Sequence, residues 1–272
     1  MSEVILAALG QPETARRILD AARALADEVG KAHIAALVVR IPPEATIMPT
    51  EEILSAEIRA RIAAAERERA AQLRRIFDFW AAQTAEFGHH AEWIDVVGLP
   101  AKEICLRGAR ADLIVTDRLP RPIDQFAKDA LYAALFDCHR PVLVVPPHAP
   151  SALGKHIAIA WKDDGRAIKA VIPAMRYFAS ADRISVLIGY RGNVVPDVIP
   201  APLAERDISA EICPIAIGSG PFGQALLAKT GELGADVLVM GAYAHSPLRE
   251  MIFGGVTRYV LHNAELPVLM RH

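Results

Sequence analysis

Short apolar runs alternate with amphipathic segments along the whole chain. The runs that begin at Val4, Ile34, Ile157 and Ile184 are four to six residues long, rich in Val, Ile and Leu, and not strictly alternating with polar residues. This pattern is typical of strands buried on both faces of a parallel sheet. Between such runs, apolar residues recur every three or four positions, as in residues 168–175, which predicts amphipathic helices.

The alternating pattern occurs twice. Val4 matches Ile157 at an offset of 153, Ile34 matches Ile184 at 150, and Gly98 matches Gly218 at 120. Each copy has five strand-like runs, and their alternation with helices predicts an α/β fold. We therefore expect two tandem doubly wound domains, each a five-stranded parallel sheet with strand order 3-2-1-4-5, packed as a pseudo-dimer.

The boundary between the copies is predicted in residues 146–155, where proline, serine and glycine interrupt the periodicity. The expected domains are residues 1–148 and 153–272. The fall in offset from 150 to 120 places about 30 extra residues in the first copy, and residues 51–87 have the spacing of one or two long amphipathic helices. Such a helix covers its own domain and the neighbouring copy, or it docks a protein partner.

Composition narrows the class of protein. Of 272 residues, 53% are hydrophobic, which suffices for a core, and 30 basic against 32 acidic residues leave a formal charge of −2, so nucleic acid is not an expected partner. Cys105, Cys138 and Cys213 lack metal-ligand spacing and are interpreted as core thiols in a reducing compartment. Without a signal peptide or a long apolar stretch, we expect a cytoplasmic protein with no membrane partner.

A ligand site is expected in the second copy. In a doubly wound sheet the ligand crevice lies beyond the carboxyl ends of the strands, where the strand order reverses. With order 3-2-1-4-5 that point brings Trp161 and Lys162 beside Gly241. The pair Gly254 and Gly255 then precedes a predicted helix beginning at Val256 and Thr257, where backbone N–H groups could bind phosphate, although two glycines could also serve tight turns alone.

The loop after this fourth strand, GAYAHSPLREMIFGGVT, resembles the C-terminal signature of the universal stress protein family, Gly-x2-Gly-x9-Gly followed by Ser or Thr. The resemblance implies five-stranded α/β domains, dimeric or in tandem, many of which bind ATP or other adenine nucleotides. Gly241 matches the first signature glycine and Gly254 the third. Ala244 replaces the second, and Gly255 stands at the Ser/Thr position, with Thr257 two residues later.

Two further residues are assigned through this resemblance, and a third through its place in the loop. Lys162 aligns with the aspartate that contacts the nucleoside in ATP-binding relatives, so it either attracts phosphate or pairs with a neighbouring aspartate. Ile188 matches a hydrophobic position lining the adenine pocket and is equally compatible with the core. Arg249, in the signature loop, could bind phosphate oxygens through paired hydrogen bonds or pair with an acidic residue.

The first copy departs further from the signature. Asp117 stands where Gly241 stands in the second copy, no glycine pair follows, and Leu9 takes the position of the nucleoside-binding aspartate; Gly10 remains. A carboxylate at the phosphate end of a crevice repels a phosphate ligand. The first copy is therefore interpreted as a degenerate half that binds no nucleotide.

The sequence contains no nucleophile elbow, zinc-protease helix, Walker A run or dinucleotide fingerprint. The leading hypothesis is a tandem universal stress protein, not an enzyme, whose second domain binds ATP or another adenine nucleotide with Mg²⁺ as a regulatory ligand. The alternatives are an interaction scaffold with both sites degenerate, and a binder of another small anionic metabolite. We also expect a protein partner of unknown identity, and an oligomeric state of monomer or homodimer.

Overall fold

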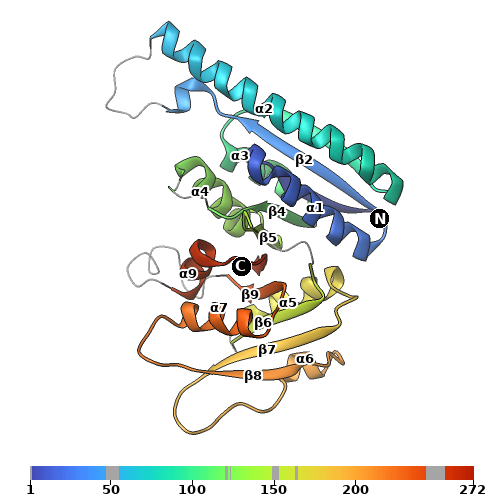
Figure 1. The fold of residues 1–272 in the computed structure, drawn as a ribbon, viewed down its shortest axis with the longest axis vertical. Coiled ribbons are helices and arrows are strands. Elements are labelled where there is room, and N and C mark those ends of the chain that lie inside the picture. Colours follow the sequence, from blue (N-terminus) through green and yellow to red (C-terminus); the bar gives the residue numbers. More distant parts are fainter. Residues whose placement is uncertain are drawn as a thin grey trace. The chain divides into compact units, whose positions relative to one another are not determined.

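The computed structural model describes residues 2–46, 55–119, 122, 124–148, 153–162, 165–242 and 255–272 (Figure 1). The chain forms two compact units, Met1–Arg140 and Pro141–His272. Among the described residues, no helix is both long enough and apolar enough to cross a membrane.

The described elements of the first unit alternate between strand and helix, as the sequence pattern predicts. They are β1 (Glu3–Ala8), α1 (Pro12–Val29), β2 (Ala32–Arg40), η1 (Pro43–Thr46), α2 (Ala56–Thr84), η2 (Ala85–Phe87), β3 (His90–Val97), α3 (Pro100–Gly108), β4 (Leu113–Asp117), α4 (Gln125–Tyr132) and η3 (Ala133–Asp137).

The sheet of the first unit has the order β3-β2-β1-β4, and all of its pairs are parallel. Strands β1, β2 and β4 are mostly apolar; Ile5, Ile34 and Leu113, for example, have no exposed surface. The chain adds β2 and β3 on one side of β1 and β4 on the other side, so the strand order reverses between β1 and β4. The carboxyl ends of these two strands therefore form the topological switch point of the unit.

Helix α2 covers its own unit. It packs on α1, β2 and β3, with α1 and α2 side by side in Figure 1. Leu73, Phe77 and Trp80 supply its buried face, which explains the recurring apolar positions in that part of the sequence. Its 29 residues form one continuous helix.

The second unit begins one strand earlier than the repeat in the sequence. Its described elements are β5 (Val142–Val145), β6 (His156–Trp161), α5 (Arg166–Tyr177), β7 (Arg183–Tyr190), α6 (Ala201–Ala204), β8 (Glu211–Ala216), α7 (Phe222–Glu232), β9 (Val237–Gly241), α9 (Val256–Asn263) and β10 (Val268–Arg271).

The strands of the second unit have the order β5-β10-β9-β6-β7-β8. The strands of the second repeat, β8-β7-β6-β9-β10, are parallel in order 3-2-1-4-5, which confirms the predicted topology. Strand β5 comes from the first repeat, yet it pairs with β10 in antiparallel register, Val144 facing Val268 and Val142 facing Met270. The sequence pattern did not predict this pairing.

One expected helix of the second repeat is nearly absent. Between β7 and β8, where the alternation predicts a helix, the chain forms a loop and only the four-residue α6. Pro196, Pro200 and Pro202 explain the difference, because proline lacks the N–H that an interior helical position donates. Val194 and Val198 in this loop are 83% and 75% exposed.

Candidate functional site

The predicted site residues Trp161 and Gly241 end neighbouring strands of the second unit. Strands β6 and β9 pair in parallel up to Ala160 and Met240, so the next residue on each strand is one of these two. Strand order reverses between β6 and β9. The topological switch point of the second unit thus lies where the sequence places it.

Trp161 and Ile188 lie opposite each other in the register of β6 and β7. The Trp161 side chain is 9% exposed, and Ile188 is half-buried. Lys162 follows directly and is exposed. The carboxyl edge of the sheet thus combines an apolar floor, which suits a planar base, with a cation at its border.

Gly241 places no side chain at the end of β9. It faces Arg271 of β10, and the N–H of the next residue, Ala242, donates to the Arg271 carbonyl at 2.9 Å. Ala242 is fully buried. The backbone is therefore anchored to β10 at this point while the strand end carries only hydrogen where the first repeat has the Asp117 side chain.

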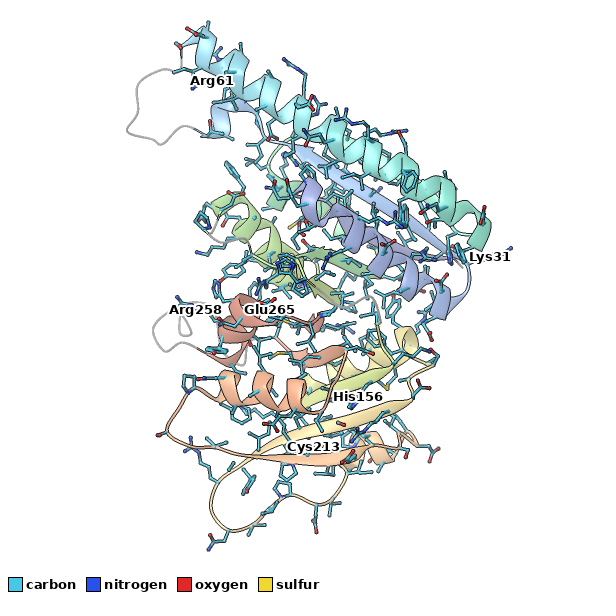
Figure 2. The ribbon with its side chains drawn as sticks, viewed as in Figure 1. Lys31, Arg61, His156, Cys213, Arg258 and Glu265 are labelled. Atoms are coloured by element: carbon cyan, nitrogen blue, oxygen red, sulfur yellow. The ribbon has the colours of Figure 1, made fainter. Side chains whose placement is uncertain are left out.

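Helix α9 begins at the same edge of the sheet, because a crossover helix runs back from the carboxyl end of one parallel strand to the amino end of the next. Gly255 is its N-cap residue and provides no side-chain cap. Val256 is half-buried and Thr257 is 4% exposed, so the Thr257 side chain belongs to the packed face of the helix. Arg258, in the first turn, is exposed (Figure 2).

Three predicted site residues, Ala244, Arg249 and Gly254, lie outside the described residues. The others divide into two groups. Trp161, Lys162, Ile188 and Gly241 stand at adjacent strand ends, and Gly255, Val256 and Thr257 form the beginning of α9.

In the first unit, Asp117 occupies the corresponding strand end. Burial raises the pKa of its carboxyl group to about 7, and the negative charge of Glu13 raises it further. Hydrogen bonds from the Thr14 hydroxyl and the Gly10 N–H favour the ionised form and lower the pKa, but they do not outweigh burial. Its Oδ1 is buried and has no hydrogen-bond partner among the described residues. A Cβ on Gly10 would approach the Asp117 Oδ2 to 3.1 Å, so glycine suits this turn.

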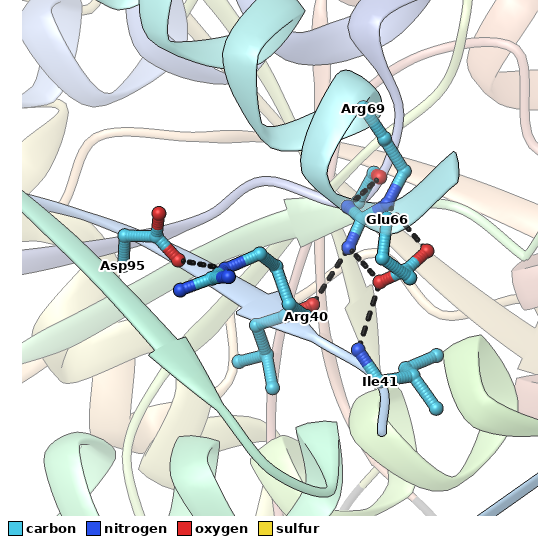
Figure 3. Close-up of polar contacts among 7 residues, drawn as sticks. Arg40, Ile41, Glu66, Arg69 and Asp95 are labelled. Atoms are coloured by element: carbon cyan, nitrogen blue, oxygen red, sulfur yellow. Dashed lines mark hydrogen bonds and ion pairs between the residues drawn. The ribbon is translucent and has the colours of Figure 1, made fainter. Parts of the chain in front are cut away.

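Two side chains of α2 reach the same edge of the first sheet (Figure 3). The Arg69 guanidinium donates to the carbonyl of Gly10 at 2.8 Å and to the carbonyl of Val39 at 2.7 Å. It also pairs with the Glu66 carboxylate through Nε at 3.1 Å and Nη2 at 2.8 Å. Glu66 in turn accepts the N–H of Ile41 at 2.8 Å.

This network is mostly shielded from solvent, because the side chains of Glu66 and Arg69 are 19% and 17% exposed. Burial alone would raise the pKa of Glu66, but its hydrogen bonds with Arg69 and Ile41, aided by the charges of Arg69 and Arg40, hold that pKa below the ordinary value. Glu66 is therefore ionised at neutral pH, and the pair is a true ion pair.

Sequence reasoning missed Glu66, Arg69 and Arg258 as site residues. Glu66 and Arg69 are three positions apart on a helix, a spacing common on solvated faces. Their only distinguishing signal is that they lie on the stripe with Leu73 and Trp80, which the structure buries. Arg258 could have been noticed as a cation at the positive end of a helix dipole.

The remaining histidines and cysteines form separate local contacts. His89 is buried and its Nε2 lies 2.8 Å from Oδ1 of Asp27. Cys138 and Cys213 are buried, in line with their interpretation as core thiols, whereas Cys105 is partly exposed and does not fit it. Among the described residues, no three metal-ligating side chains gather in a way that could hold a metal ion.

Residues 201–272 match the sequence profile of the universal stress protein family. This part of the chain is therefore similar to universal stress proteins. The match contains β8, α7, β9, α9 and β10, the elements that surround the signature loop, and it confirms the family that the sequence resembles. A search of curated proteins returned no match.

Solved structures extend the likeness to both units. A universal stress protein from Archaeoglobus fulgidus DSM 4304 aligns with 100% of this chain and 96% of its own, with 16% identity and a TM-score of 0.69. Two proteins from Pseudomonas aeruginosa align with 99% of the chain. The protein from strain UCBPP-PA14 is 19% identical, is covered over 93% of its own chain and aligns with a TM-score of 0.59. The protein from strain PAO1, of unknown function, is 18% identical, is covered over 92% of its own chain and aligns with a TM-score of 0.54. At these identities the likeness establishes the tandem fold.

Proposed function

We propose that the second unit binds an adenine nucleotide, with ATP as the ligand to test first, at the carboxyl ends of β6 and β9. The observation that carries the proposal is the start of α9. Gly255 caps this helix without a side chain, and its first turn contains Arg258 and no acidic residue. A cation there opposes the helix dipole, and an anion bound to the first-turn N–H groups would remove that conflict.

The strand ends supply the second element of recognition. Trp161 and Ile188 offer apolar surface for a base, and Gly241 leaves the end of β9 without a side chain. The signature resemblance favours adenine over other bases, and Lys162 and Arg258 favour a polyphosphate over a nucleoside. Trp161, Gly241, Gly255 and Arg258 would thus contact the ligand from three segments of one unit.

The nucleotide would be a regulatory ligand and not a substrate. The described residues at this edge, 161–162, 188, 241–242 and 255–258, include no carboxylate or imidazole that could activate water. Any divalent cation would arrive with the triphosphate, bound to its oxygens. The change in the protein on binding would therefore be conformational.

Isothermal titration calorimetry with ATP, ADP, adenosine and tripolyphosphate tests the proposal. We expect ATP to bind in a 1:1 ratio and Arg258→Ala to weaken ATP binding about tenfold with little effect on adenosine. Arg183→Ala is the matched control, because Arg183 is exposed at the amino end of β7 and pairs with Glu211. No heat with millimolar ATP would refute the proposal.

The same titration separates the nucleotide from another anionic metabolite. If tripolyphosphate binds as tightly as ATP, the site recognises anions without the base, and the adenine part of the proposal is wrong. Trp161 is the only tryptophan of the second unit, so a ligand-dependent change in fluorescence that is lost in Trp161→Phe would locate the ligand there.

A further inference from the structure

The first unit already contains side chains at the place where a ligand would bind. Its switch point lies between β1 and β4, and Gly10 stands in the turn that follows β1. The Gly10 carbonyl accepts a hydrogen bond from Arg69 of α2, and its N–H donates to Asp117 at the end of β4. Both backbone groups of this turn are thus engaged by side chains of the same unit.

The neighbouring strand is engaged in the same way. At the end of β2, the Val39 carbonyl and the Ile41 N–H form an acceptor and a donor two residues apart, the pattern that a planar ligand edge with one donor and one acceptor would bind. Arg69 donates to the first of these groups at 2.7 Å and Glu66 accepts from the second at 2.8 Å. The ion pair therefore presents the same hydrogen-bonding groups as such a ligand.

Among the described residues, no similar network is present at the equivalent edge of the second unit. All residues between β7 and β8 are described, and they form a loop and the short α6 in place of a long helix. No side chain from this connection has a hydrogen bond comparable to those of Arg69 to the described residues that follow β6 or β7, which leave out residues 163 and 164. The difference between the repeats thus corresponds to the extra segment of the first copy.

We propose that α2 is a resident occupant of the first crevice, with Glu66 and Arg69 in the position of a ligand, so that each chain binds one nucleotide. The number of nucleotides per chain, one, rests on the proposed function of the second unit, whereas the occupancy of the first crevice by α2 does not. Removing the pair would expose the Gly10 and Val39 carbonyls and the Ile41 N–H to a neutral nucleoside, while Asp117 would continue to disfavour a phosphate.

Photolabelling with 8-azidoadenosine, followed by peptide mapping, tests this inference in the full chain. The test variant is Glu66→Ala/Arg69→Ala. The matched control is Glu68→Ala/Arg75→Ala, which removes the same residue types from the same helix, where they pair at 3.4 Å with more than 60% of each side chain exposed. We expect label in peptides from residues 1–140 to rise at least tenfold in the test variant only.

Each outcome of the labelling has one meaning for the inference. A folded test variant, verified by circular dichroism, that labels the first unit no more than the control would overturn it, as would equal labelling of the first unit in the unmodified protein. If the double variant does not fold, Arg69→Ala alone replaces it, with the same expectation and the same overturning result. Failure of the proposed function appears separately, as the absence of ATP binding to the second unit.

Discussion

Asp112 and Asp236 perform the same task in the two units. Each aspartate directly precedes the fourth strand of its repeat and accepts backbone N–H groups where the first strand begins. Asp112 accepts the N–H of Val4 at 2.9 Å, and Asp236 accepts those of Gly154, Lys155 and His156 at 2.7 to 3.0 Å. In both units the aspartate N–H also donates back to the first strand.

Replacing these two aspartates should destabilise the protein to different degrees. Asp236→Ala leaves three N–H groups without their acceptor and should lower the free energy of unfolding by about 2 to 4 kcal/mol, whereas Asp112→Ala, which removes one, should lower it by about 1 to 2 kcal/mol. Urea denaturation followed by circular dichroism measures both. Equal losses would show that the number of accepted hydrogen bonds does not set the contribution.

Asp117 should make the stability of the protein depend on pH near neutrality. Its folded-state pKa is about 7 and its ordinary value 3.8, so between these values the folded chain holds a proton that the unfolded chain has lost. Stability must therefore fall as pH rises from about 4 to about 7. As pH rises from 5 to 8, the free energy of unfolding of Asp117→Asn should increase by about 1 to 3 kcal/mol relative to that of the unmodified protein.

Unfolding in urea at several pH values measures this effect. Glu13→Gln is the companion variant, because the charge of Glu13 contributes to the raised pKa of Asp117. It should shift the fall in stability to lower pH without abolishing it. The same pH dependence in Asp117→Asn as in the unmodified protein would contradict the assignment.

Glu66 should show the opposite dependence on pH. Its pKa lies below the ordinary 4.5, so its ion pair with Arg69 contributes stability above that value and loses it as pH falls through the folded-state pKa. Glu66→Gln should lower the free energy of unfolding by about 1 to 3 kcal/mol at pH 7, and the difference should shrink as pH falls below 4.5. A difference that is independent of pH would indicate a packing effect in place of the ion pair.

Two glycines with positive φ should respond differently to substitution by alanine. Gly154 has φ +82°, and a Cβ there would overlap the ring of the buried Phe178. Gly30 has φ +88° with open space around that position. We expect Gly30→Ala to lower the free energy of unfolding by about 1 kcal/mol through backbone strain, and Gly154→Ala to lower it by about 2 to 4 kcal/mol. Thermal or urea unfolding of both variants decides this.

Much of the fold could be predicted because it depends on short-range patterns. The strands read from Val4 and Ile157 are present as β1 and β6, and the switch point between Trp161 and Gly241 follows from the strand order alone. The pairing of β5 with β10 could not be predicted, because an apolar strand at the edge of a parallel sheet does not encode which edge it joins or in which direction.

The candidate sites were predicted less completely. Asp117 was expected to stand in the first crevice as a carboxylate, and the structure places it there, but its raised pKa depends on burial by residues distant in sequence. Arg69 was missed because its partners are the backbone carbonyls of Gly10 and Val39, and no residue type identifies an accessible carbonyl. The burial of the Thr257 side chain at the start of α9 also depends on helical packing, which its place in the sequence does not show.

Strand β5 belongs to the first repeat in the sequence but to the second compact unit in the structure, where it pairs with β10. The boundary of the sequence repeat and the boundary of the folded unit therefore differ by one strand. A fragment cut at the apparent linker would leave β10 with an open edge, and the fragment containing the first repeat would carry β5 without its antiparallel partner β10. Unpaired edges invite association with other chains. Halves separated at that linker should therefore be prone to aggregate. The two repeats are no longer structurally equivalent, because one supplies a strand to the other.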